Sequence, residues 1–500
     1  MADPGRLAQF PCEIQLRIAT LLDVDGLKSL RLVHSFYTPA ASSVLFQTIH
    51  FSANTLSFER AVHVAESPHL ADHVRQFVYH VGRLARGYKR SHFSRGSFEY
   101  PICRVAADSS FDPTDAAMVD QMYYRYLVEL NAEDEFEFLR EKEVLEALTS
   151  CFKNLVSIAA VQDTRDSPEP GEPKGHIERR TYVPTDTYPL CRNPLTSLLE
   201  ATTNSRIVAL HAGFLDWMAF MDIDQVPGTP EQLGRLRVLH LQLFIEDYGK
   251  FNQEKDQSES FRKFLANCTG IETLILCLPD MSFHRDDKYL ECMTRSSLYA
   301  SHFPRLLSVH LTGLITYEDI LVGFLESHAD TLIDLTLENV HIARRLDCDS
   351  PYFWPTWMPE GAPDYSCRHG SVLSLFHRIH NACHLKTASI GGVFTNVFDE
   401  AWVVADNKIA AATPEKGFAP DVERFLCRKG PWPFLPLDSY LEMQRKYMVE
   451  NGPWREGSGD HPDPPAMRHC SDDSWRFDRG YLAYHCVPEP RQDPALTQWW

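Results

Sequence analysis

The chain has 500 residues, of which 44% are hydrophobic and 23% charged, a composition typical of a globular protein with a large core. Its formal net charge of -19 argues against nucleic acid as a partner, because phosphate binding depends on clustered Lys and Arg. No apolar run reaches the roughly 18 residues of a transmembrane helix, so we expect no membrane partner.

The cysteines indicate a reducing compartment. Thirteen of them are scattered along the chain without Cys-x-x-Cys pairs. This pattern fits reduced thiols better than a disulfide framework or a zinc site. The beginning of the sequence also lacks the basic and then apolar pattern of a secretory signal. We therefore expect a cytoplasmic and/or nuclear protein that needs no cofactor.

The first fifty residues predict three short helices. Pro11, at the first helical position, and Glu13 mark the beginning of the first helix. Apolar residues then recur at i, i+4, i+7 and i+8 and form one face: Ile14, Ile18, Leu21 and Leu22. A turn over Asp23-Val24-Asp25-Gly26 separates this helix from the next.

Two further apolar stripes follow this turn. The second stripe consists of Leu27, Leu30, Val33 and Phe36/Tyr37, and the third of Ala40, Ala41, Val44 and Leu45. Chains below roughly 40 residues seldom hold a core unaided. We therefore expect another protein, or the rest of this chain, to cover these stripes.

Residues Leu7 to Phe51 resemble the fungal form of the F-box motif, L-P-x-E-I-x-x-x-I-x-x-x-L-D-x-x-D-L-x-x-L-R-L-V. Phe10 stands where leucine is usual, and the aromatic residue that ends the second stripe falls at Tyr37, but neither difference removes apolar volume. The resemblance implies that this face binds the Skp-type linker subunit of a cullin-RING ubiquitin ligase. The implied contact residues are Phe10, Pro11, Ile14, Ile18, Leu21, Leu22, Leu27, Leu30, Leu32, Val33 and Tyr37. The alternative is an ordinary helical subdomain folded onto the rest of the chain.

An aliphatic-x-x-aliphatic-x-aliphatic spacing recurs after this unit. The clearest instances are Leu236/Leu239/Leu241, Ile271/Leu274/Leu276, Leu306/Val309/Leu311, Leu332/Leu335/Leu337 and Leu385/Ala388/Ile390; weaker ones are Val74/Phe77/Tyr79, Leu155/Ile158/Ala160 and Ile207/Leu210/Ala212. The last two positions of a triplet lie on one face of a short strand, and the first packs where the strand begins.

Helical segments alternate with these strands. We expect them over Phe138 to Lys153, Phe261 to Asn267, Tyr317 to His328 and Val372 to His384, and an acidic helix from Glu129 to Glu146. The order resembles the divergent leucine-rich-like solenoids that often follow a fungal F-box. This resemblance implies an α/β fold: a three-helix F-box-like unit, then an irregular leucine-rich-repeat-like solenoid with a parallel sheet and outer helices.

The predicted boundaries divide the chain into four parts. They are 1–51 for the F-box-like helical domain, 52–150 for a connecting region with a first strand and the acidic helix, 151–400 for the solenoid, and 401–500 for an irregular C-terminal capping segment. An insertion at Asp347 to Gly370 contains four aromatic residues that we predict to contact a target protein: Tyr352, Phe353, Trp354 and Trp357. The alternative is that these rings pack back onto the solenoid as a lid.

The catalytic signatures G-x-S-x-G, G-x-x-x-x-G-K-[ST], G-x-G-x-x-G and H-E-x-x-H are absent from the sequence. We therefore expect no enzymatic activity, but a substrate-recognition adaptor that joins a target protein, through the linker subunit, to a cullin. Two alternatives stay open. One is a ligase-independent interaction scaffold, and the other is a metal-dependent enzyme centred on His377, His380 and His384, which lie on one predicted helix.

Overall fold

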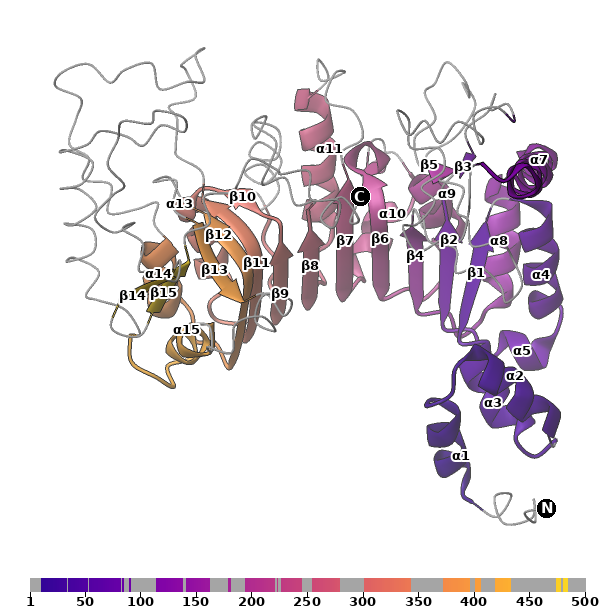
Figure 1. Cartoon of the computed structure of the whole chain (residues 1–500), viewed down its shortest axis with the longest axis horizontal. Helices are drawn as coiled ribbons and strands as arrows, with labels where there is room; N and C mark the ends of the chain where they lie inside the picture. Colours follow the sequence, from indigo (N-terminus) through magenta and orange to yellow (C-terminus); the bar gives the residue numbers. More distant parts are fainter. Residues whose placement is uncertain are drawn as a thin grey trace. The chain divides into compact units, whose positions relative to one another are not determined.

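The computed structural model contains two compact units, which we call unit 1, including Met1–Tyr248, and unit 2, Gly249–Thr497. The structure describes residues 10–33, 35–52, 54–81, 83–84, 90, 114–137, 141–161, 179–180, 194–220, 223, 226–244, 254–278, 301–342, 372–395, 401–405, 419–432, 474–477 and 480–483. Each unit combines helices with a mostly parallel sheet, so the chain belongs to the mixed α/β class (Figure 1). Within the described part, no helix combines the length and apolarity that a membrane crossing requires.

Unit 1 begins with three helices and continues with alternating strands and helices. In chain order its elements are α1 (Cys12–Ala19), α2 (Val24–Val33), α3 (Thr38–Leu45), β1 (Thr48–Ser52), α4 (Thr55–Ala65), α5 (Pro68–Ala71), β2 (Gln76–His80), β3 (Arg83–Leu84), α7 (Ala116–Glu137), α8 (Glu141–Cys151), β4 (Ser157–Val161), β5 (Arg179–Arg180), α9 (Pro194–Ala201), β6 (Ala209–Asp216), the 3-10 helix η2 (Trp217–Phe220), α10 (Thr229–Gly234) and β7 (Val238–Phe244). The main sheet has the order β1-β2-β4-β6-β7, and all of these neighbours are parallel.

The predicted triplets of unit 1 form an in-register ladder. The pairs run across the sheet in two rows, Phe77–Ile158–Leu210–Leu239 and Tyr79–Ala160–Ala212–Leu241. Each of these side chains is at most 1% exposed. The strands predicted at these triplets are confirmed, and burial of every second residue is what sets their register.

Unit 2 repeats this pattern. Its elements are α11 (Glu254–Asn267), β8 (Thr273–Cys277), β9 (Ser308–Thr312), β10 (Ile315–Thr316), α13 (Glu318–Glu326), β11 (Asp334–Ile342), α14 (Val372–Ala382), β12 (Thr387–Thr395), β13 (Ala401–Ala405), α15 (Ala419–Leu426), β14 (Ser474–Phe477) and β15 (Gly480–Ala483). The strand order is β8-β9-β11-β12-β13, with β10 beside β11, and only β13 in this sheet runs antiparallel to its neighbour. The triplets again pair in two rows, Leu274–Val309–Leu335–Ala388 and Leu276–Leu311–Leu337–Ile390.

A paired irregularity bends the last parallel strands of unit 2. The register between β11 and β12 shifts at Asn339, which has a φ of 53°. Gly392 on β12 has a φ of 69°, and a Cβ atom there would lie 3.1 Å from the backbone nitrogen of Asn339. Glycine is needed at this position, because both the positive φ and the close backbone approach exclude a side chain.

Aromatic residues fill the core beside the first strands of unit 1. The ring of Phe51 lies 5.9 Å from that of Phe77 and 5.8 Å from that of Phe136, which α7 supplies. The single acidic helix predicted around Glu129 to Glu146 is wrong, because α7 ends at Glu137 and α8 begins at Glu141. Packing explains the division: α7 brings Phe136 onto β1, whereas α8 buries Leu145 and Leu148.

Candidate protein-docking surface

The three N-terminal helices form a small bundle with a core of little volume. α3 packs against both α1 and α2. The core consists of Ala19, Leu27 and Ala41, with Leu30, Val44 and Leu45 partly buried around it. Two of the three central residues are alanines, whose small side chains allow the helices to approach closely. The bundle therefore closes without using most of its large apolar side chains.

Local hydrogen bonds fix the beginning of α1. Pro11 is the N-cap rather than the first helical residue predicted from the sequence, and its carbonyl accepts hydrogen bonds from the backbone N–H groups of Ile14 and Gln15 at 3.0 and 3.2 Å. The side chain of Gln15 is buried and donates to the carbonyl of Phe10 at 2.8 Å. α1 thus buries Gln15 and Ala19, while its branched residues face outward.

Asp23 caps the second helix. Its Oδ1 accepts the backbone N–H of Gly26 at 2.7 Å, and its carbonyl accepts that of Leu27 at 2.9 Å. The turn predicted over residues 23–26 is therefore shorter than expected, because α2 already begins at Val24. An aspartate at this position satisfies a free N–H group and favours the positive end of the helix.

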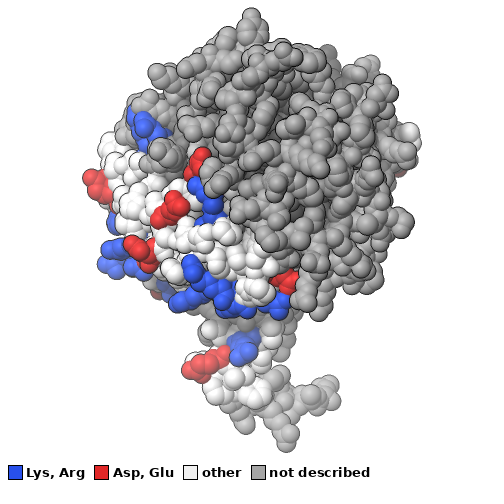
Figure 2. All heavy atoms as spheres, turned by 90° about the vertical axis from the view of Figure 1, so that its left-hand side faces the viewer, with Lys and Arg blue, Asp and Glu red and all other residues white. Residues whose placement is uncertain are grey.

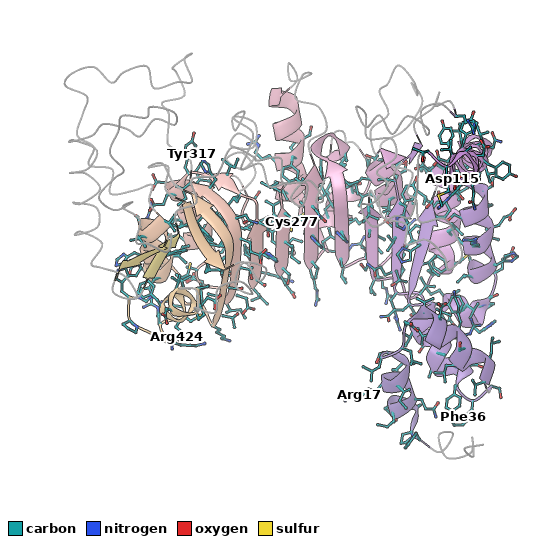
Figure 3. The ribbon with its side chains drawn as sticks, in the orientation of Figure 1. Arg17, Phe36, Asp115, Cys277, Tyr317 and Arg424 are labelled. Carbon is teal, nitrogen blue, oxygen red and sulfur yellow. The ribbon has the colours of Figure 1, made fainter. Side chains whose placement is uncertain are left out.

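Large exposed hydrophobic residues are concentrated on this bundle. Ten of the fifteen that the described residues contain lie between residues 10 and 36: Phe10, Ile14, Leu16, Ile18, Leu21, Leu22, Val24, Leu32, Val33 and Phe36. We call these ten residues the N-terminal apolar surface. Leu21 and Leu32 are the most exposed, at 81% and 87%. Phe36, labelled in Figure 3, lies at the end of the bundle that is remote from the sheet.

Such a concentration has an energetic meaning. Burying one leucine side chain is worth about 1.5–3 kcal/mol, and monomeric proteins rarely leave contiguous apolar patches open to water. Short helices that present branched side chains outward match the helix-in-groove mode of protein recognition. The arrangement suits binding to an apolar groove on a second polypeptide.

The predicted linker-binding residues separate into two groups. Eight are exposed: Phe10, Pro11, Ile14, Ile18, Leu21, Leu22, Leu32 and Val33. Leu27 and Tyr37 are buried, at 4% and 7%, and Leu30 is half-buried. The prediction that these three residues contact the linker subunit is corrected. Leu27 and Leu30 pack in the bundle's own core, and Tyr37 is too deeply buried for a second protein to reach it.

Three exposed residues were missing from the predicted set. Leu16 lies off the apolar stripe of its helix, Val24 was assigned to a turn, and Phe36 was treated as a neighbour of Tyr37. Periodicity does not find them, because it detects a stripe without saying which side of a helix faces the core. Compared with family models and with curated proteins, the chain matches none of them. The assignment of this surface therefore depends on residues and geometry alone.

The other predicted contact residues, Tyr352, Phe353, Trp354 and Trp357, lie outside the described residues. The predicted first strand at Val74/Phe77/Tyr79 is β2, because β1 precedes it at Thr48–Ser52. In the predicted capping segment, β13 joins the sheet of unit 2, and α15 packs against β12 and α14.

Two of the three histidines of the metal alternative, His377 and His380, make other contacts. His380 stacks on Phe425 with 4.0 Å between ring centroids, and its Nδ1 lies 2.8 Å from the carbonyl oxygen of Phe425. Nδ2 of Asn381 donates to Nδ1 of His377 at 3.1 Å. Burial raises the pKa of the neighbouring Cys383 thiol to about 11, which disfavours the thiolate that a metal needs. Among the described residues, no group of three or more His, Cys, Asp or Glu side chains is placed to hold a metal ion.

Proposed function

We propose that the chain is a non-enzymatic substrate-recognition adaptor of an SCF-type ubiquitin ligase. In this proposal the bundle α1–α3 is an F-box-like unit that binds a Skp-type linker subunit, and through it a cullin. The single observation that carries the proposal is the exposure of the N-terminal apolar surface, with Leu21 at 81% and Leu32 at 87%. The sequence from Leu7 to Phe51 supports the same assignment, because it resembles the fungal F-box motif.

The parallel strands of the two units support the second half of the proposal. We interpret them as an irregular leucine-rich-repeat-like solenoid with a parallel sheet and outer helices, which would present a target protein. The support comes from the rows of paired triplets, such as Leu276–Leu311–Leu337–Ile390, in which each strand buries its residues against its neighbours. A repeat stack of this kind offers extended surfaces for binding proteins.

The mechanism would be proximity. A target held by the solenoid and a conjugating enzyme recruited through the linker subunit would share one assembly, which raises the effective concentration of a target lysine near the ubiquitin. Positioning of this kind lowers the barrier without an acid or base from the adaptor.

The test is binding of a purified fungal Skp-type linker subunit by the full chain and by the double variant Leu21→Asp with Leu32→Asp. Both leucines are exposed, so the free chain should keep its fold. In an apolar groove, two carboxylates should weaken binding at least roughly 100-fold, because each would lose its hydration. Circular dichroism and the thermal midpoint should match those of the wild type.

The matched control is Tyr124→Asp with Leu307→Asp, which places the same charges on exposed hydrophobic residues outside the bundle. This control should bind the linker subunit as the wild type does. A wild-type chain without affinity for the linker subunit, or a bundle variant that binds normally, would overturn the proposal. Co-purification of the linker subunit without a cullin would favour the ligase-independent scaffold.

A further inference from the structure

A row of exposed cations follows the turns that lead into the strands of unit 1. These connections, which we call turns, precede β2, β4, β6 and β7 and comprise residues 66–75, which include the short helix α5, and residues 152–156, 202–208 and 235–237. We call their five cations the basic edge: Arg75, Lys153, Arg206, Arg235 and Arg237, all of them exposed. Glu66 and Asp72 are the only carboxylates in the same turns. The edge is therefore positive in a chain whose formal net charge is -19.

Parallel pairing makes this row continuous. The carbonyl of Arg75 accepts the N–H of Val156 at 2.9 Å, the carbonyl of Val156 accepts that of Val208 at 2.9 Å, and the carbonyl of Val208 accepts that of Arg237 at 2.8 Å. Neighbouring strands lie about 4.8 Å apart, so the row from Arg75 to Arg237 extends about 15 Å. Screening at physiological salt acts over about 8 Å, so the fields of neighbouring cations add.

The corresponding turns of unit 2 carry no such excess. Over residues 268–272, 302–307, 328–333 and 383–386, the charged residues other than histidine are Arg305, Lys386, Glu272 and Asp330, which balance. Figure 2 shows one face of the molecule, on which Lys and Arg of the described residues lie among Asp and Glu. Within the turns themselves the excess of cations is thus confined to unit 1, although Lys429, whose Nζ donates to the carbonyl of Lys386 at 2.8 Å, lies beside the last turn of unit 2.

The basic edge lies at the end of the sheet from which the docking bundle emerges. α3 ends at Leu45 and β1 begins at Thr48, so the bundle joins the strands where they begin (Figure 1). The carbonyl of Gln47, inside this junction, accepts the N–H groups of Arg75 and Gln76 at 2.9 and 3.0 Å. Arg75 is therefore hydrogen-bonded directly to the segment that joins the bundle, and with it the N-terminal apolar surface, to β1.

We propose that the partner which docks on the N-terminal apolar surface carries an acidic segment that lies along the basic edge. This inference rests on the proposed function, because the linker subunit is the partner in question. A line of cations about 15 Å long matches an extended acidic segment better than a single phosphate group. Continuity with the apolar surface favours one partner that spans both. The charges would accelerate association and fix the direction in which the partner docks.

The test is the association rate constant of the purified linker subunit, measured at roughly 50 and 300 mM NaCl. The variant is Lys153→Glu with Arg206→Glu, because within the described residues these two side chains donate no hydrogen bond, whereas Arg235 donates to the carbonyls of Glu231 and Thr203. For the wild type we expect the rate constant to fall as salt rises. For the variant we expect about a tenfold lower rate constant at low salt and little salt dependence, with a nearly unchanged dissociation rate.

Arg305→Glu with Lys386→Glu is the matched control, since it makes the same charge change in the turns of unit 2. Its association rate constant should stay within about twofold of the wild type, because neither residue belongs to the basic edge that the acidic segment would follow. Equal rates for the two double variants, or a wild-type rate that ignores salt, would overturn the inference and leave the proposed function standing. Failure of the wild type to bind the linker subunit would remove both.

Discussion

The guanidinium group of Arg378, on α14, lies 3.2 Å from the carboxylate of Glu318, on α13. The Glu318 side chain is only 2% exposed, and the hydroxyl of Ser374 also donates to it at 2.7 Å. A buried carboxylate is tolerated when it is paired and hydrogen-bonded, as it is here. This pair therefore sets how two successive helices of unit 2 pack.

Replacing Arg378 by Met should lower the free energy of unfolding by about 3 kcal/mol, because it leaves the Glu318 carboxylate buried without a counter-charge. Urea denaturation of the full chain measures the loss. Asp319→Asn is the control: Arg378 also contacts this carboxylate, at 2.6 Å, but it is 54% exposed. We expect the control to cost less than 1 kcal/mol. Equal losses in the two variants would show that burial of Glu318 is not what matters.

Leu27 and Leu32 lie five residues apart on α2. Substitution by Asp should greatly reduce stability at Leu27 and hardly change it at Leu32. Leu27 is 4% exposed and belongs to the core of the bundle, whereas Leu32 is 87% exposed. Leu27→Asp should unfold the bundle, because a carboxylate would replace the largest side chain of that core. Leu32→Asp should change stability by no more than about 0.5 kcal/mol. Hydrogen exchange of the α1–α3 amides distinguishes the two, and protection that survives Leu27→Asp would contradict the assigned core.

Gly392→Ala should destabilise unit 2 by about 2 kcal/mol, because φ is 69° and the new Cβ would collide with the Asn339 side chain and lie 3.1 Å from its backbone nitrogen. Gly323→Ala provides the control inside α13, where a Cβ would meet no atom within 4 Å. A helical alanine there should be neutral or stabilising by up to about 1 kcal/mol. Thermal unfolding of the two variants gives the comparison. A Gly392→Ala protein as stable as the Gly323→Ala protein would refute the bulge argument.

His328 should make unit 2 less stable in mild acid. Its Nε2 accepts the backbone N–H of Phe303 at 2.8 Å, so Nδ1 carries the proton and donates to the carbonyl of Phe324 at 2.7 Å. Burial and the neighbouring His302 lower the pKa of His328, and the hydrogen bond to Phe324 offsets only part of that shift. Protonation at Nε2 would break the bond to Phe303.

The sign of the pH effect follows from this lowered pKa. In the unfolded chain His328 takes up a proton near its ordinary pKa of about 6.5, whereas the folded chain resists it. Stability should therefore fall as the pH drops below about 6.5. The cost of His328→Gln, measured by urea denaturation, should be smaller at pH 5 than at pH 7.5. A cost that stays constant between the two pH values would refute this role.

The sequence predicts the strands well, because alternate burial leaves a clear pattern. Every predicted triplet, from Val74/Phe77/Tyr79 to Leu385/Ala388/Ile390, coincides with a strand of the sheet of its unit. β1 was not predicted, although Phe46-x-x-Ile49-x-Phe51 has the same spacing, because residues 1–51 were assigned to the F-box-like helical domain. Phe51 is nevertheless fully buried, which shows that the ladder depends on apolar volume and not on leucine.

The docking surface is predicted less completely, for a physical reason. Hydrophobic periodicity treats every large apolar residue of a helix as a candidate for one buried face. In the bundle, Ala19 and Ala41 occupy the centre and let the helices approach, so larger residues such as Leu21 remain outside. Which stripe closes the bundle and which stays open depends on how three helices pack together, and that information is not contained in the spacing of one helix.

The short connection at Gln47 has a mechanical consequence. Only Phe46 and Gln47 separate α3 from β1, and the Gln47 carbonyl is held by two N–H groups at the beginning of β2. Such a connection allows little rotation, so the bundle and the first strands should move as one rigid body. A protein bound to the bundle would therefore keep a constant orientation relative to the first strands. Its distance from a second protein bound to these strands would be set by the fold and not by a flexible linker.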